Sequence, residues 1–207
     1  MKTVYDHKRC LYLGEMFYTL NTNYNNVIGC GFYDVKSNTL YIPRNILNGG
    51  ILPLFINDTC NKHYNLIIVN QTKRVIERFE PIDITEYGYL NKLLKQFCKD
   101  YHYDYVYNIR GPQYTEMNYL KISTMNCGFW ILSYLDNRLC CLNVCQSDFL
   151  RGWMKQISII GVDKYINKYK SQILNGECDE YNLRIHEKSV LNSIYNRLPL
   201  DYYIYRH

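Results

Sequence analysis

The chain has 207 residues, which suits one domain with a sizeable core and leaves little room for two. Its hydrophobic fraction of 47% is ordinary for a globular protein, and its net charge of +5 is mild, with the basic residues scattered along the chain. Nucleic-acid-binding proteins gather such charge on one face, so the composition argues against that class. It also argues against a membrane partner, because no stretch approaches the roughly 18 consecutive apolar residues of a membrane span.

Cysteine usage indicates a reducing compartment. There are nine cysteines, an odd number, and residues 1–7 contain no apolar signal core. We therefore expect mostly free thiols in a protein of the cytoplasm or nucleus, or of the host cytoplasm or virion if the source is a virus. Cys140, Cys141 and Cys145 have one short ligand-like spacing but no second Cys or His pair downstream, so we expect no metal and no other cofactor.

Short strands are predicted in the first part of the chain. Residues 27–33 and 39–42 are strand-like and are separated by a turn, and the rest of the first 55 residues suggests irregular structure and hairpins. Residues 63–69 form a β-rich apolar run. After a polar turn, residues 74–79 alternate polar and apolar side chains, so the two segments together predict a hairpin.

Helices are predicted mainly in the second half. The apolar spacing of residues 89–98 predicts an amphipathic helix, and a strand follows at 103–109. Another helix begins at Cys127. A third runs from about residue 148 to 173, with an interruption at a glycine near its middle, and a last short helix is predicted at 188–197.

These elements predict one α+β domain. No repeat, linker or low-complexity segment divides residues 1–207. We expect a central mixed β-sheet flanked by helices, with the helix that starts at Cys127 packed against the sheet.

His63 and Glu80 form the first candidate pair for catalysis. His63 starts the first strand of the predicted hairpin and Glu80 follows the second, so the two residues are neighbours in an antiparallel pair. A carboxylate in that position accepts the imidazole N–H, fixes its tautomer and orients it. The alternatives are a structural histidine and a surface glutamate paired with a lysine.

Cys127 is the candidate nucleophile, because it stands at the start of a helix. A helix N-terminus favours the thiolate and offers a backbone N–H to an oxyanion. Gly128 leaves the backbone beside the sulfur unshielded. The alternative is a buried cysteine at the start of a core helix. Trp130 is expected to pack in the core rather than to meet a substrate.

The context of these residues resembles a family of cysteine proteases. The motifs that carry the resemblance are His63-Tyr64, Phe79-Glu80-Pro81, Gly111-Pro112-Gln113 and Cys127-Gly128-Phe129-Trp130. The first two are similar to the His-aromatic strand and the turn of adenovirus-type proteases. The last two resemble the Ulp-like, SUMO-protease-type enzymes of large DNA viruses. The resemblance covers about residues 60–140.

The resemblance implies a fold and a set of roles. The fold is the papain-like core of the adenain and SUMO-protease type (clan CE). His63 is implied as base, Glu80 as orienting acid, Cys127 as nucleophile and Gln113 as the side-chain donor to the oxyanion. Tyr64, where the family commonly has Trp, is implied as a substrate-binding wall of the groove.

The implied activity is hydrolysis of peptide or isopeptide bonds in a protein substrate. Two substrates stay open: ubiquitin or a ubiquitin-like modifier, and a viral precursor protein processed during particle maturation. A non-catalytic interaction module with the protease fold is the main alternative, although such a module has no chemical need for the full set of residues. Zinc or nucleic-acid binding through the cysteines at 140–145 and scattered basic residues is a further alternative that lacks the required ligand spacing.

Overall fold

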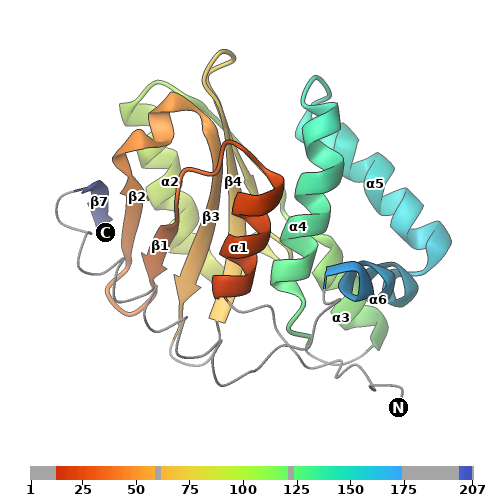
Figure 1. Ribbon diagram of the computed structural model, residues 1–207. Coiled ribbons are helices and arrows are strands. Elements are labelled where there is room, and N and C mark those ends of the chain that lie inside the picture. The colour runs from red at the N-terminus through yellow and green to blue at the C-terminus, as the bar shows by residue number, and fades with distance from the viewer. Residues whose placement is uncertain (1–12, 59–61, 121–123, 174–200, 207) are drawn as a thin grey trace.

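The computed structural model describes residues 13–58, 62–120, 124–173 and 201–206, and it shows an α+β fold (Figure 1). Its strands are β1 (Gly31–Asp34), β2 (Thr39–Pro43), β3 (Gly50–Asn57), β4 (Lys62–Asn70), β5 (Val75–Phe79), β6 (Asp104–Tyr107) and β7 (Tyr202–Arg206). In this part of the chain they form one sheet in the order β6-β5-β4-β3-β1-β2-β7. The pairs β1–β3 and β5–β6 are parallel and the others antiparallel, so the predicted mixed sheet is confirmed.

Helices lie on both faces of this sheet (Figure 1). They are α1 (Leu13–Asn23), α2 (Gly88–Asp100), α3 (Pro112–Leu120), α4 (Cys127–Arg138), α5 (Gln146–Ile160) and α6 (Val162–Ile173), with the short 3-10 helices η1 (Arg44–Asn48), η2 (Ile84–Tyr87) and η3 (Leu139–Cys141). Helix α2 covers one face through side chains such as Leu94 and Phe97, whereas α1 and α4 cover the other through Leu20 and Trp130. None of the helices described here combines the length and hydropathy needed to cross a bilayer.

The clearest sequence patterns form the predicted elements. Strands β4 and β5 form the predicted hairpin, with Leu66 opposite Phe79 at its open end. The amphipathic pattern that predicted a helix at 89–98 lies within α2, and its apolar side faces the sheet. Gly161, with a φ of 93°, separates α5 from α6 at the predicted interruption.

Three segments differ from the prediction. Helix α1 and most of β3 lie within the first 55 residues, where neither a helix nor a separate strand was expected at these positions. Pro53 weakens the strand signal of β3, but it precedes the stretch from Leu54 onward that pairs with β1, so its missing N–H does not interrupt that ladder. Helix α3 starts at Pro112, a position where the N–H has no intrahelical partner in any case. The short helix predicted at 188–197 lies outside the described residues.

Helix α4 is almost fully enclosed. Ten of its twelve residues are buried, because the sheet lies on one side and α5 and α6 lie on the other. This location explains why the helix is apolar on nearly all sides. Trp130 is completely buried, as predicted, and the Tyr134 ring stacks on Phe79 of β5 at a centroid distance of 3.8 Å.

A buried ion pair fixes the C-terminal end of α4 to the sheet. Arg138 donates from Nε and Nη2 to the two carboxylate oxygens of Glu77 on β5, at 2.9 and 2.7 Å. Both side chains are less than a tenth exposed. The Tyr134 hydroxyl donates to the same carboxylate, and the third guanidinium nitrogen of Arg138, Nη1, donates to the carbonyl of Cys141. The pair therefore has the bidentate geometry and full hydrogen bonding that a buried charge needs.

We expect Arg138→Met to lower the free energy of unfolding by about 3–5 kcal/mol, because it leaves the Glu77 carboxylate buried without a cation. Arg151→Met is the matched control, since Arg151 belongs to an exposed pair with Asp148 and should cost less than about 1 kcal/mol. Denaturant unfolding measures both changes. The double variant Glu77→Leu/Arg138→Met should recover most of the loss, and a loss equal to that of the single variant would contradict this account.

Candidate active site

His63 and Glu80 meet at the open end of the β4–β5 hairpin. Strand β5 pairs with β4 only from Leu66 onward, so His63 extends beyond the end of β5 and Glu80 follows that end directly. The imidazole Nε2 lies 2.6 Å from a carboxylate oxygen of Glu80. Glu80 has no exposed surface and His63 is 4% exposed. The predicted proximity is confirmed, and a surface glutamate is excluded.

Two further polar residues hold the Glu80 carboxylate. Asn65 donates to Oε2 at 2.9 Å and Arg78 donates to the same oxygen at 3.1 Å. Arg78 also donates from Nε to the Asn65 side-chain oxygen at 2.6 Å, which closes a ring of three buried side chains. The other oxygen, Oε1, faces His63 and accepts the backbone N–H of Ile82 at 3.0 Å. Each oxygen thus has two partners, and the orientation of the carboxylate is fixed.

Cys127 is the third residue of the site. It is the first residue of α4, and its side chain interacts with His63 in a way that raises the pKa of the imidazole. Because Nε2 is occupied by Glu80, Nδ1 is the nitrogen left to face the sulfur. The first N–H groups of a helix have no intrahelical acceptor, so the backbone at Cys127 is a ready donor to a developing negative charge.

His63 and Glu80 each stabilise the charged form of the other. Burial lowers the pKa of His63, but the Glu80 carboxylate and the hydrogen bonds to Cys127 and Glu80 raise it more, and the net result is a pKa of about 10. Burial raises the pKa of Glu80, and the charges of His63 and Arg78 together with hydrogen bonds from His63 and Ile82 bring it below its usual range. The geometry thus favours an imidazolium beside a carboxylate.

Gln113 lies close to the other elements of the site, but the described contacts do not join it directly to Cys127. Its amide nitrogen donates to the carbonyl of Thr124, three residues before Cys127, at 2.7 Å. Its backbone N–H bonds the Pro81 carbonyl at 3.0 Å. This contact requires glycine at position 111, because a Cβ on Gly111 would lie 2.3 Å from the Glu80 carbonyl oxygen. The start of α3 is therefore packed on the backbone of the Glu80 turn.

Glu116 supports the segment that leads into Cys127. Its buried carboxylate accepts hydrogen bonds from the Asn126 side chain, from the Trp130 indole at 2.8 Å and from the Thr124 hydroxyl at 3.3 Å. Burial raises the pKa of Glu116, and these donors oppose that rise. Three residues around the nucleophile are thus tied to one side chain of α3.

Tyr64 does not have the exposed position that was expected of a residue lining a substrate groove. Its side chain is 2% exposed and packs on Phe55 in the core. The ring that covers His63 instead is that of Tyr87, in η2, with centroids 5.6 Å apart and planes 19° apart. Burial, with the negative charges around it, raises the pKa of Tyr87, so its hydroxyl keeps its proton beside the site.

The raised pKa of His63 predicts a pH-dependent contribution to stability. A group whose pKa rises on folding stabilises the folded state fully below its unfolded pKa of about 6.5, and that contribution disappears as the pH approaches about 10. We expect the difference in free energy of unfolding between the native chain and His63→Gln to shrink by about 4 kcal/mol over this range. Denaturant titrations at pH 6 and pH 10 measure it. A pH-independent difference would show that His63 is neutral in the folded protein.

All six described cysteines are free, and within the described residues no group of three or more His, Cys, Asp or Glu side chains could hold a metal ion. Cys127 is the described cysteine that interacts with a histidine through its side chain. Comparisons of the chain with protein-family models, with curated proteins and with solved structures return no match.

Proposed function

We propose that the chain is a cysteine protease that hydrolyses peptide or isopeptide bonds with Cys127, His63 and Glu80. The observation that carries the proposal is one buried imidazole that lies 2.6 Å from a carboxylate and also interacts with a thiol at a helix N-terminus. Nucleophilic cysteine catalysis needs a base beside the thiol and a third group that orients the base. A helix packed on the sheet that carries the histidine is also the arrangement of the papain-like core of adenain and SUMO proteases.

In the proposed mechanism the thiolate of Cys127 attacks the carbonyl carbon of the scissile bond, after its proton has passed to His63. The oxyanion receives a hydrogen bond from the Cys127 backbone N–H, and the proposed second donor is the Gln113 amide, which in the resting structure donates to the carbonyl and the hydroxyl of Thr124. The imidazolium then protonates the leaving amine, and the thioester remains on Cys127. Water, deprotonated by His63, hydrolyses the thioester, which releases the carboxylic acid product and restores the thiol.

The substrate in this proposal is a protein. Ubiquitin or a ubiquitin-like modifier with C-terminal glycines is one candidate, and a viral precursor cleaved after small residues is the other. The Tyr87 ring stacks on His63 beside the site, and a bulky ring in that position would favour small residues before the scissile bond.

The test is incubation with C-terminal electrophile probes of ubiquitin and of several ubiquitin-like modifiers, beside Cys127→Ala. An adduct with one modifier, absent in the variant, would establish the nucleophile and identify the substrate. Fast selective alkylation of Cys127 without any adduct would point to a peptide protease with a viral precursor as its substrate. Neither adduct nor selective alkylation would favour a non-catalytic interaction module and would overturn the proposal.

A further inference from the structure

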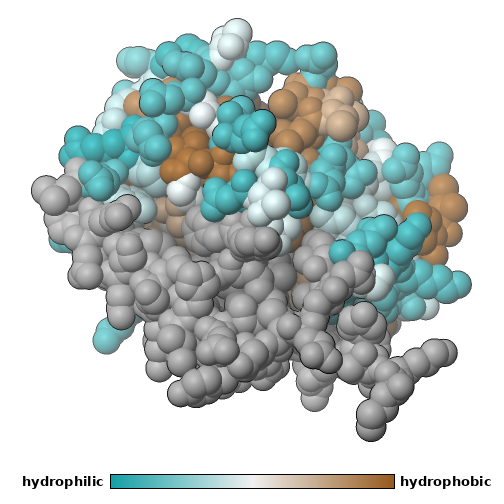
Figure 2. Space-filling view, viewed as in Figure 1, coloured by the Kyte–Doolittle hydropathy of each residue, from teal (hydrophilic) through white to brown (hydrophobic). Residues whose placement is uncertain are grey.

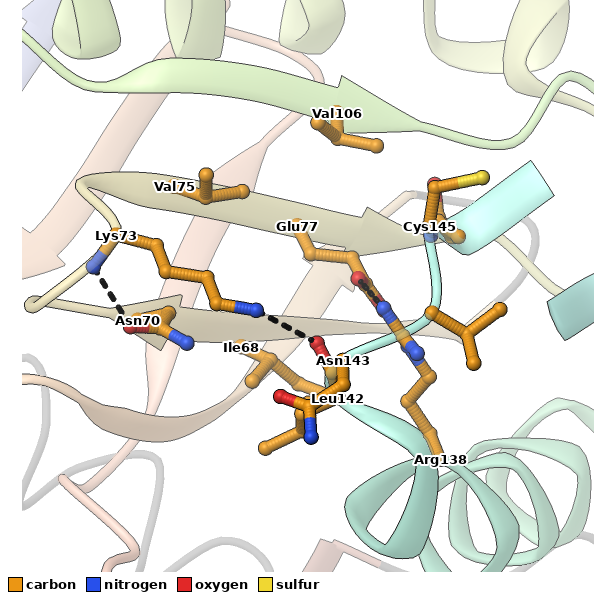
Figure 3. Close-up of a pocket in the computed structure, with 12 residues that line it drawn as sticks. Ile68, Asn70, Lys73, Val75, Glu77, Val106, Arg138, Leu142, Asn143 and Cys145 are labelled. Atoms are coloured by element: carbon orange, nitrogen blue, oxygen red, sulfur yellow. Dashed lines mark hydrogen bonds and ion pairs between the residues drawn. The ribbon is translucent and has the colours of Figure 1, made fainter. Parts of the chain in front are cut away.

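A cavity of about 280 Å³ lies at the end of α4 opposite to Cys127 (Figure 3). It opens between the sheet and the segment that joins α4 to α5. Its walls are largely apolar, with Ile68, Val75 and Val106 from the strands and Leu142 and Val144 from the connecting segment. Figure 2 shows hydrophobic surface at the top of the molecule, over the segment that follows α4.

The charged side chains that line the cavity sum to a net positive charge. Glu77 and Arg138 neutralise each other at its floor, where both are buried. Lys73 is the third charged residue of the lining, and it is exposed. Its ammonium donates to the Leu142 carbonyl at 3.3 Å, and no carboxylate of the described residues forms an ion pair with it. The lining therefore carries one net positive charge beside apolar walls.

A cysteine lies at the other side of the same opening. The exposed thiol of Cys145 contributes to the lining, and Figure 3 shows it on the side of the cavity away from Lys73. The thiol donates to Asp148 at 3.0 Å and lies near the Ser147 hydroxyl. A ligand that extends from Lys73 across the apolar walls would end beside Cys145.

We propose that this cavity binds a small organic carboxylate with an apolar body, with the carboxylate on Lys73 and the body between Val75, Val106 and Leu142. An apolar pocket with a few polar groups that orient the ligand is the usual construction of a small-molecule site. The single uncompensated cation selects an anion, and the apolar walls select an organic one over phosphate or sulfate. The same chemistry is offered by a free carboxylic acid and by the C-terminus of a peptide that ends in an apolar residue.

Protection of Cys145 from alkylation tests the proposal on the native chain. The alkylation rates of Cys145 and of Cys140, an exposed cysteine outside the lining, are measured by mass-spectrometric peptide mapping. The probes are octanoate and a short peptide ending in leucine, each beside its uncharged amide. At ten times the dissociation constant, the acid should slow Cys145 about tenfold and leave Cys140 unchanged. Whichever acid protects at lower concentration identifies the source of the carboxylate.

Lys73→Met should weaken this protection about fivefold, and Lys155→Met, an exposed lysine on α5, should leave it unchanged. Equal protection by the acids and their amides would overturn the carboxylate assignment, as would protection that survives Lys73→Met. Absence of protection by every probe would overturn the site itself. None of these results bears on the protease proposal, because Cys127 and His63 do not line this cavity.

Discussion

Cys127→Ala is expected to reduce peptide-bond hydrolysis by a factor on the order of 10⁶, because removal of the nucleophile leaves only binding and the oxyanion donors. The fold should be retained. Cys127 is almost completely buried, and alanine keeps its Cβ while it removes one sulfur from a helix that is held at its far end by the Arg138–Glu77 pair. Turnover of a cleavable reporter measures the activity, and thermal unfolding checks the fold.

Cys145→Ala is the matched control for this variant, since Cys145 also stands at the start of a helix but lies in the exposed N-cap position of α5. It should keep activity within about threefold. Turnover by Cys127→Ala within a factor of ten of the native rate would show that another residue is the nucleophile. A parallel loss in both variants would show that the assay follows thiol content rather than the proposed site.

Glu80→Gln is expected to lower activity by about 10²–10⁴-fold, less than the loss of the nucleophile. The amide can still accept a hydrogen bond from His63, but it removes the charge that raises the pKa of the imidazole. The pH–activity profile should therefore shift as well, with the basic limb moving to lower pH. Glu86→Gln, on the exposed side of the same segment, should change activity by less than about threefold.

Glu80→Gln should also destabilise the fold by about 3 kcal/mol, because Arg78 loses the Glu80 carboxylate as its counter-ion and remains fully buried. Adding Arg78→Met should restore much of that stability without restoring activity. This separation distinguishes the two roles of Glu80, as partner of His63 and as counter-ion of Arg78. If the double variant recovers activity together with stability, the charge of Glu80 has no catalytic role.

Periodic patterns made part of the fold predictable. Helix α2 has an unbroken apolar period of 3.6, and the sheet covers its one apolar side, whereas β4 is a continuous apolar run whose side chains pack in the clusters on both faces of the sheet. Strand β3 is also central and buried on both faces, and Pro53 interrupts its strand signal. Strand β7 pairs with β2 across more than 150 residues of chain, and such a long-range partner has no local signal.

The part of the candidate site that lies at the open end of the β4–β5 hairpin could be predicted from the sequence. His63 and Glu80 are neighbours because an antiparallel pair brings its ends together. The same alternation places Tyr64 on the opposite face from His63, which is why its ring lies in the core. It also places Asn65 beside His63 and Arg78 beside Glu80, so two polar residues in apolar strands were the available signal for them. Tyr87 comes from a 3-10 turn, and its stacking on His63 depends on tertiary packing alone.

The two anchored ends of α4 constrain how the chain can vary in length. Cys127 meets His63 at one end, and Arg138 meets Glu77 at the other. Eleven positions of an α-helix correspond to about three complete turns, so both side chains point to the same side of α4. One inserted or deleted residue would rotate one end by about 100° relative to the other and would separate one of the two pairs. Length variants are therefore expected beyond Arg138, in the exposed segment before α5, and not within the helix.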